Sequence, residues 1–145
     1  MTCSKKLFSP AATVSLIFCL KSATRLSFTI KLAKASIKHG LETGQPLPVN
    51  PGDYNQALGA QRACFVTLNE NNQLRGCIGS LQAHRPLVKD VSDNAYAAAF
   101  RDPRFAPLSD DELEKLDIHI SILTPASPMS FSSEADLISQ LRPGK

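Results

Sequence analysis

The amino-acid sequence predicts a single α+β domain in which helices flank an antiparallel sheet. An apolar helical stripe lies in the first third of the chain, a strand–turn–strand pattern lies near its middle, and no βαβ unit repeats. The 145 residues suffice for one hydrophobic core. Hydrophobic residues make up 43% and charged residues 20%, a composition that excludes disordered and fibrous proteins.

The first 25 residues precede this pattern. Two lysines stand before an apolar run at residues 11–20, an order that resembles a secretory signal peptide. Hydroxyl residues interrupt the run, and it falls short of the roughly 18 apolar residues that a membrane span requires. We therefore expect residues 1–25 to be a disordered extension or a non-native start, and residues 26–145 to form a cytoplasmic domain.

The first predicted helix begins at Leu26. Its apolar residues recur at i, i+4, i+7 and i+11, and its lysines fall on other faces. The stripe comprises Leu26, Ile30, Ala33, Ile37 and Leu41. Pro46 and Pro48 cannot continue a helix, so a loop over residues 45–59 follows.

Residues 62–68 and 73–80 are predicted to form a β-hairpin. β-Branched and aromatic residues favour the first strand, and residues 69–72 have turn composition. Because side chains alternate across a strand, Arg75 and Cys77 are predicted to point to the same face, about 6–7 Å apart.

A second helix is predicted to begin at Pro86 and to end at residues 102–103. Ser109 and Glu112 have the spacing of a capping box, which predicts a short acidic helix. Residues 116–122 alternate between apolar and polar, as a half-buried strand does.

The net charge of +3 and the metal-ligand residue types give little indication of a ligand. Basic residues are concentrated in residues 1–60, which would suit a polyanion, but a solvated lysine face explains the same excess. The four cysteines and three histidines show no zinc spacing. We expect no metal, no organic cofactor and reduced thiols.

Several segments, in this order, resemble the AMMECR-type domain family, called protein A of the AmmeMemoRadiSam system in bacteria and archaea. They are Leu74-Arg75-Gly76-Cys77-Ile78-Gly79-Ser80, then Arg85-Pro86-Leu87-Val88 with Asn94, then Ala98-Ala99-Phe100-Arg101-Asp102-Pro103-Arg104-Phe105, and Leu116-Asp117-Ile118. The resemblance covers residues 26–145. The family pattern continues beyond Lys145, so the chain resembles a member that is incomplete at its carboxy terminus.

This resemblance implies two unequal lobes with a cleft beside the Arg-Gly-Cys segment. It also implies association with a Memo-like protein and a radical S-adenosylmethionine enzyme. It implies no particular reaction, because none is settled for the family.

The leading hypothesis is a cysteine-centred site that binds or modifies a small anionic metabolite. A guanidinium beside a thiol favours the reactive thiolate, so Cys77 and Arg75 are the catalytic candidates. Gly76 and Gly79 would let a substrate approach the backbone, and Ser80 would offer donors to an anion.

Other polar residues extend this candidate site. Together with Arg75, Arg101 and Arg104 are predicted to converge on a phosphate or carboxylate, with Asp102 orienting one of the arginines. His84 or His119 is the candidate base.

The same residues have structural explanations. A buried cysteine is ordinary core packing, glycines in strands mark bulges, and residues 101–104 suit a helix end held by a local ion pair. At the level of function, the alternatives are a nucleic-acid-associated factor and a non-catalytic partner subunit.

Overall fold

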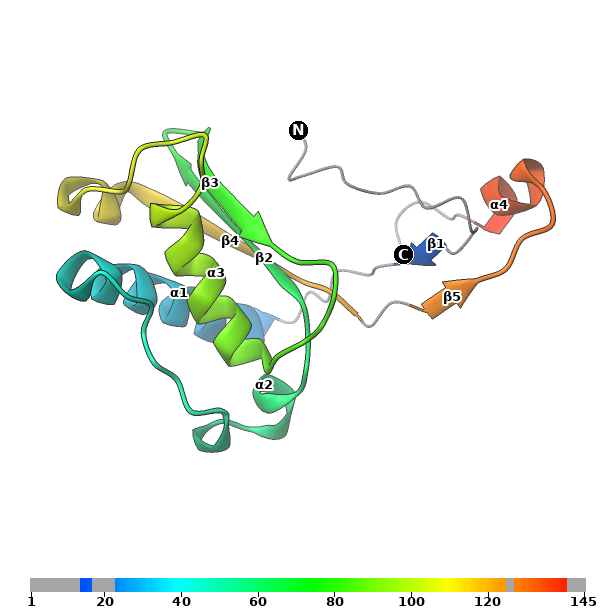
Figure 1. Ribbon diagram of the computed structural model, residues 1–145, viewed down its shortest axis with the longest axis horizontal. Coiled ribbons are helices and arrows are strands. Elements are labelled where there is room, and N and C mark those ends of the chain that lie inside the picture. Colours follow the sequence, from blue (N-terminus) through cyan, green and yellow to red (C-terminus); the bar gives the residue numbers. More distant parts are fainter. Residues whose placement is uncertain (1–13, 17–22, 125–126, 141–145) are drawn as a thin grey trace.

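The computed structural model describes residues 14–16, 23–124 and 127–140 (Figure 1). Most of the predicted extension, residues 1–25, lies outside the described residues. The helices are α1 (Ala23–Thr43), α2 (Gln56–Gly59), α3 (Leu87–Phe100) and α4 (Glu134–Gln140), with two 3-10 turns, η1 (Pro51–Asp53) and η2 (Asp110–Lys115). The strands are β1 (Val14–Leu16), β2 (Cys64–Glu70), β3 (Gln73–Gly79), β4 (Leu116–Ile122) and β5 (Ser127–Met129).

The main sheet is antiparallel, with the strand order β3-β2-β4. The predicted hairpin is β2–β3, and its turn is built by Asn71 and Asn72, whose φ angles are 52° and 61°. Asparagine tolerates this left-handed region, which explains why the turn lies there. The two short strands β1 and β5 pair separately as a two-stranded ribbon.

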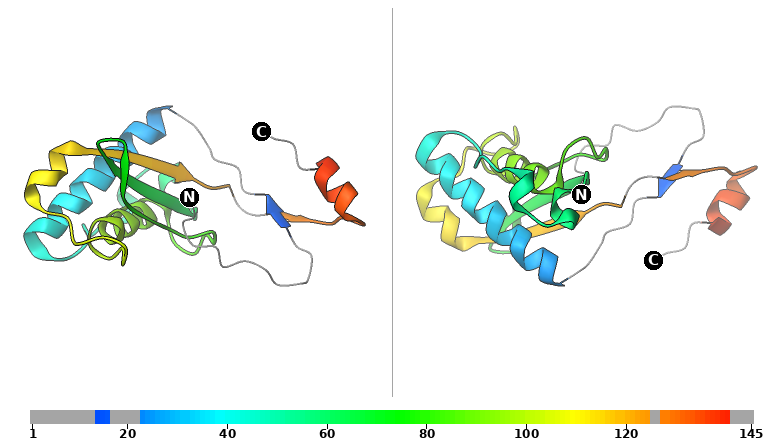
Figure 2. Two further views of the ribbon diagram at one scale, coloured as in Figure 1. Left: turned by 90° about the horizontal axis from the view of Figure 1, so that it is seen from above. Right: turned by 90° about the horizontal axis from the view of Figure 1, so that it is seen from below.

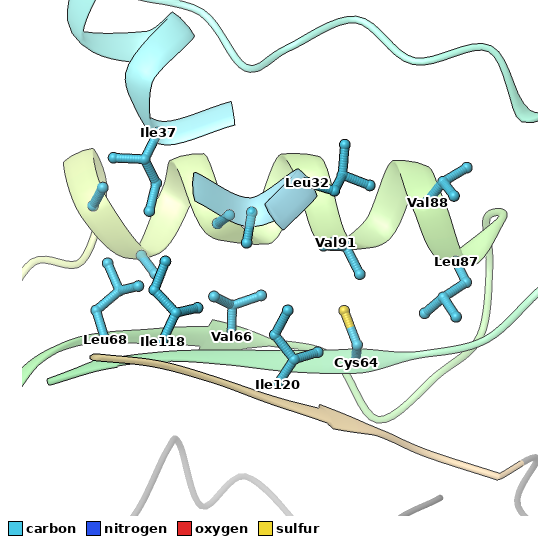
Figure 3. Packing of buried hydrophobic residues seen from close by; sticks show 14 of the residues in the cluster. Leu32, Ile37, Cys64, Val66, Leu68, Leu87, Val88, Val91, Ile118 and Ile120 are labelled. Carbon is cyan, nitrogen blue, oxygen red and sulfur yellow. The ribbon is translucent and has the colours of Figure 1, made fainter. Parts of the chain in front are cut away.

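Both long helices pack on the same face of the main sheet (Figures 1 and 2). Helix α3 contacts β2 and β3, whereas α1 contacts α3 and β4. The core lies between these two layers. It includes Val66 and Leu68 of β2, Ile118 and Ile120 of β4, Val88 and Val91 of α3, and Leu32 and Ile37 of α1 (Figure 3). The predicted α+β class is therefore confirmed, while the cleft between two lobes stays a prediction.

Three predicted elements differ in detail. Pro86 precedes α3 as its N-cap instead of opening it. The predicted acidic helix is the 3-10 turn η2, and its expected capping box is present, with the Ser109 N–H donating to Glu112 at 2.8 Å. Helix α1 begins three residues earlier than the apolar stripe indicated, and helix ends commonly shift by this much because terminal residues need no inward face.

Gly76 allows β3 to approach α3 closely. A Cβ atom at this position would lie 2.1 Å from the carbonyl oxygen of Ala98, which is backbone and cannot rotate away. The Arg-Gly-Cys segment therefore has a packing reason for its first glycine.

Replacing Gly76 with alanine should destabilise the fold, because β3 must move away from α3. We expect the free energy of unfolding in urea to fall by about 1–3 kcal/mol. Gly52→Ala is the matched control, since its nearest neighbour would be the Asn50 side-chain oxygen at 3.4 Å. Equal stability of the two variants would contradict this account.

Candidate functional site

A β-bulge occurs at Arg75. Leu68 lies opposite Gly76 and Asn69 lies opposite Leu74, so Arg75 is an extra residue without an opposite partner on β2. The regular alternation that placed Arg75 and Cys77 on one face is interrupted at this point.

The Arg75 guanidinium is held by η2. Its Nε donates to Glu112 Oε1 at 2.7 Å, and its Nη2 donates to Glu112 Oε2 at 3.2 Å and to the Ala106 carbonyl at 2.9 Å. The side chain is only 14% exposed, and Cζ lies 5.9 Å from the centre of the Phe105 ring. This bidentate pair joins β3 to the segment before β4.

The pairing changes the acidity of the carboxylate. Hydrogen bonding from Arg75, followed by that from the Ser109 backbone, lowers the pKa of Glu112 to about 2. The remaining guanidinium nitrogen, Nη1 of Arg75, is buried without a hydrogen-bond partner in the described part of the chain.

Asp102 is buried and binds both β3 and Arg104. Its Oδ2 accepts from the Cys77 N–H at 3.0 Å and from Arg104 Nη2 at 2.7 Å. Its Oδ1 accepts from the backbone N–H and the Nε of Arg104. These bonds, with those from Arg104 leading, hold the pKa of Asp102 well below its usual range.

The three arginines predicted to converge on an anion are differently engaged. Arg75 pairs with Glu112, and Arg104 pairs with Asp102. The Cζ atoms of Arg75 and Arg104 both lie within 6 Å of the Phe105 ring centre, at 5.9 and 5.4 Å. Arg101 caps α3 and lies 5.2 Å from the Tyr96 ring. Two of the three positive charges are thus compensated inside the fold.

Cys77 lies on the sheet face opposite α1 and α3. Its Sγ is 3.3 Å from Thr67 Oγ1, and the residue is 6% exposed. The sulfur is disulfide-bonded in the structure, so the expectation of reduced thiols is wrong for Cys77. Cys64 is a free and buried cysteine.

The strand register places Cys77, Thr67 and His119 in one row across this face. His119 is exposed, and its Nε2 lies 2.8 Å from Asp117 Oδ2. His84 is also exposed, but its Nδ1 lies 3.0 Å from the Gln82 carbonyl oxygen, within its own loop. Of the two candidate bases, the structure therefore brings His119 toward Cys77.

The other predicted ligand residues have internal partners. A Cβ atom at Gly79 would lie 2.5 Å from both the Cys64 carbonyl and the Phe65 ring, so this glycine makes room for an aromatic side chain of the neighbouring strand. The Ser80 hydroxyl bonds to Gln82, and the Ser80 amide donates to the Cys64 carbonyl at 3.4 Å.

A network around Asp90 was not predicted from the sequence. Its Oδ2 accepts from the Cys64 N–H at 2.9 Å, and its Oδ1 accepts from Arg85 Nε at 2.6 Å. Asn94, one turn along α3, donates to the Cys64 carbonyl at 3.2 Å. Burial, followed by the charge of Asp90, strongly raises the pKa of the Cys64 thiol. The available signal was a pair of polar residues, i and i+4, beside the apolar stripe of a helix.

The described residues contain no cluster of three or more metal-ligating side chains. Among those residues, no helix is long and apolar enough to cross a membrane.

Comparison with known proteins identifies relatives of this domain. A family model described as AMMECR1 matches residues 30–145. A protein of Methanothermobacter thermautotrophicus is 36% identical over 115 residues, which are 79% of this chain and 59% of the relative. A protein of Methanopyrus kandleri is 35% identical over 121 residues, covering 81% of this chain and 58% of the relative.

A solved structure has the same fold. The uncharacterized protein PH0010 from Pyrococcus horikoshii is 36% identical, with a TM-score of 0.61, over 68% of this chain and 50% of that one. The chain therefore spans between half and three fifths of the length of these relatives.

The Arg75–Glu112 pair should make the free energy of unfolding decrease as the pH falls through the acid range. Since the folded pKa of Glu112 is about 2, below the usual value of 4.5, its contribution is complete above pH 4.5 and is lost as the pH falls toward 2. We expect the wild type to lose about 2 kcal/mol more than Glu112→Gln between pH 5 and pH 2 in urea titrations.

Glu114→Gln is the matched control, because Glu114 pairs with Lys34 on the surface, where the two side chains are 78% and 45% exposed. It should keep the wild-type pH profile. A Glu112→Gln profile parallel to the wild type would show that the pair contributes no pH-dependent stability.

Proposed function

The chain belongs to the AMMECR1 family, and from this premise we propose that it is a non-catalytic partner subunit, which binds another protein and carries out no reaction itself. The observation that supports this proposal most is the internal pairing of the arginines. Arg75, Arg85 and Arg104 each bind a carboxylate of the same fold.

A site for an anionic metabolite would need positive groups that the fold does not already use. Withdrawing Arg104 from Asp102 would leave a buried carboxylate without its counter-charge, which is unfavourable. Gly76 and Gly79 likewise make room for neighbouring protein atoms. The residues that suggested chemistry are, on this proposal, the residues that hold β3 in place.

The family resemblance indicates which partners to test. We propose a Memo-like protein and a radical S-adenosylmethionine enzyme, acting together with this chain in the cytoplasm. Any catalytic group would then belong to a partner.

The proposal predicts a complex that does not depend on the Cys77 sulfur. The purified chain, mixed with each of the two proteins from the same genome, should co-elute with at least one of them in size-exclusion chromatography. Cys77→Ser should bind equally well. Turnover of a small metabolite by the chain alone, lost in Cys77→Ser, would overturn the proposal. Retention of RNA that weakens steeply with salt would favour the nucleic-acid alternative.

A second candidate is the cysteine-centred site for a small anionic metabolite. The row of Cys77, Thr67 and His119 favours it. The Thr67 hydroxyl lies 3.3 Å from the Cys77 sulfur, so it could accept the thiol proton and donate its own proton toward the His119 imidazole. Asp117 would orient that imidazole. Such a site would operate only after reduction of the Cys77 disulfide.

This second candidate predicts that the pKa of the reduced Cys77 thiol depends on His119. After reduction, Cys77 should be alkylated below about pH 7 in the wild type, and only near the ordinary thiol pKa of about 8.5 in His119→Asn. Peptide mass spectrometry separates it from Cys64, whose buried thiol should stay unmodified until the chain unfolds. Identical pH profiles in the two proteins would eliminate this candidate.

A further inference from the structure

An aspartate–proline peptide bond, between Asp102 and Pro103, lies just beyond the end of α3. It is the one such bond in the 145-residue sequence. Because the proline nitrogen carries no hydrogen, the bond is a tertiary amide, whose nitrogen accepts a proton more readily than that of other peptide bonds. The carboxylate of the aspartate can attack the backbone carbonyl carbon of its own residue through a five-membered ring. A nucleophile and a leaving group are therefore adjacent here.

The turn after α3 polarises the carbonyl group of this bond. The Asp102 carbonyl oxygen accepts a hydrogen bond from the Phe105 N–H at 3.2 Å, in a turn with Pro103 at its second position. When a nucleophile adds to a carbonyl carbon, negative charge develops on the oxygen, and a fixed N–H donor stabilises that charge. Residues 102–105 thus combine a carboxylate, a polarised carbonyl and a proline leaving group.

Four hydrogen bonds, which we call the Asp102 latch, prevent this carboxylate from attacking. Its Oδ2 accepts from the Cys77 N–H at 3.0 Å and from Arg104 Nη2 at 2.7 Å. Its Oδ1 accepts from the Arg104 N–H at 3.1 Å and from Arg104 Nε at 3.0 Å. Hydrogen bonds to a charged acceptor are the strong ones, and the side chain must rotate out of them to reach its own carbonyl carbon.

We propose that the Asp102–Pro103 bond is a latent self-cleavage site, which the Asp102 latch keeps inactive. When the latch is released, a carboxylate oxygen of Asp102 forms a bond to the carbonyl carbon of the same residue. The C–N bond to Pro103 then breaks, and the proline nitrogen leaves with a proton from the solvent. Water opens the resulting cyclic anhydride, so the products are a carboxyl terminus at Asp102 and an amino terminus at Pro103. This inference is independent of the partner-subunit proposal, because it concerns the chain's own backbone.

Arg104 is the part of the latch that can be removed with little effect on the core. It supplies three of the four hydrogen bonds, and its side chain is 41% exposed, whereas the Asp102 side chain is 2% exposed. Cleavage would separate β2 from β4 in the sequence, but their pairing would still join the two fragments. The fragments must therefore be counted after denaturation.

The test incubates the full chain at about pH 4 and measures cleavage by mass spectrometry. This pH supplies protons for the leaving nitrogen, and it lies above the folded pKa of Glu112, about 2, so the Arg75–Glu112 pair is retained. We expect Arg104→Gln to release fragments 1–102 and 103–145 at least about 10-fold faster than the wild type, because the attack no longer breaks the side-chain hydrogen bonds of Arg104. The rate constant should not depend on protein concentration, since the reaction is intramolecular.

Matched variants separate this chemistry from a general loosening of the fold. Arg101→Gln removes a neighbouring arginine, which lies against the Tyr96 ring, and should be cleaved at the wild-type rate. Pro103→Ala, at an exposed position, makes the amide secondary and should abolish cleavage when combined with Arg104→Gln.

Folding of each variant at the same pH is checked by circular dichroism. If Arg104→Gln unfolds, Arg104→Lys replaces it, since lysine keeps the charge but lacks the planar fork that binds both carboxylate oxygens. The inference would be overturned by a folded Arg104 variant that is cleaved no faster than the wild type. Cleavage at other bonds, or cleavage that survives Pro103→Ala, would overturn it equally.

Discussion

Two buried carboxylates hold the ends of α3 against the backbone of the hairpin. Asp90, in the first turn of α3, accepts from the Cys64 N–H at the start of β2. Asp102, just beyond the other end, accepts from the Cys77 N–H of β3. Hydrogen bonds to charged groups contribute about 1.5–3 kcal/mol each, and apolar packing has no comparable direction. The position of the helix along the strands therefore depends on these two contacts.

The buried carboxylates explain why arginines are needed at these positions. A carboxylate removed from water is costly unless it is paired, and each of these acquires a guanidinium, Arg85 for Asp90 and Arg104 for Asp102. Arg75 has the same relation to Glu112 and fastens η2 to β3. Conspicuous charged residues can thus arise from the need to place a helix accurately over a sheet, without any substrate.

The fold was predictable where periodicity decides structure. The stripe from Ile30 to Leu41 and the alternation over residues 116–122 each reflect one buried face, so the helix and the strand were found. The orientation of Arg75 was not predictable, because one extra residue in β3 breaks the alternation on which the prediction relied. The Arg75–Glu112 pair joins residues 37 positions apart, a separation that local patterns do not report.

The two edge strands of the main sheet, β3 and β4, differ in how their outward backbone groups are bonded. The outward Cys77 N–H of β3 is closed by a buried carboxylate, and Arg75 binds the Ala106 carbonyl beyond it. Solvent-facing edge strands are usually kept short, bulged or interrupted by proline or lysine, since an open edge invites pairing. Strand β4 has none of these features: its seven residues pair with β2 in unbroken register, and its isoleucines face the core. Among the described residues, a buried carboxylate thus bonds the outward edge of β3, whereas β4 has a regular edge and no further strand beside it.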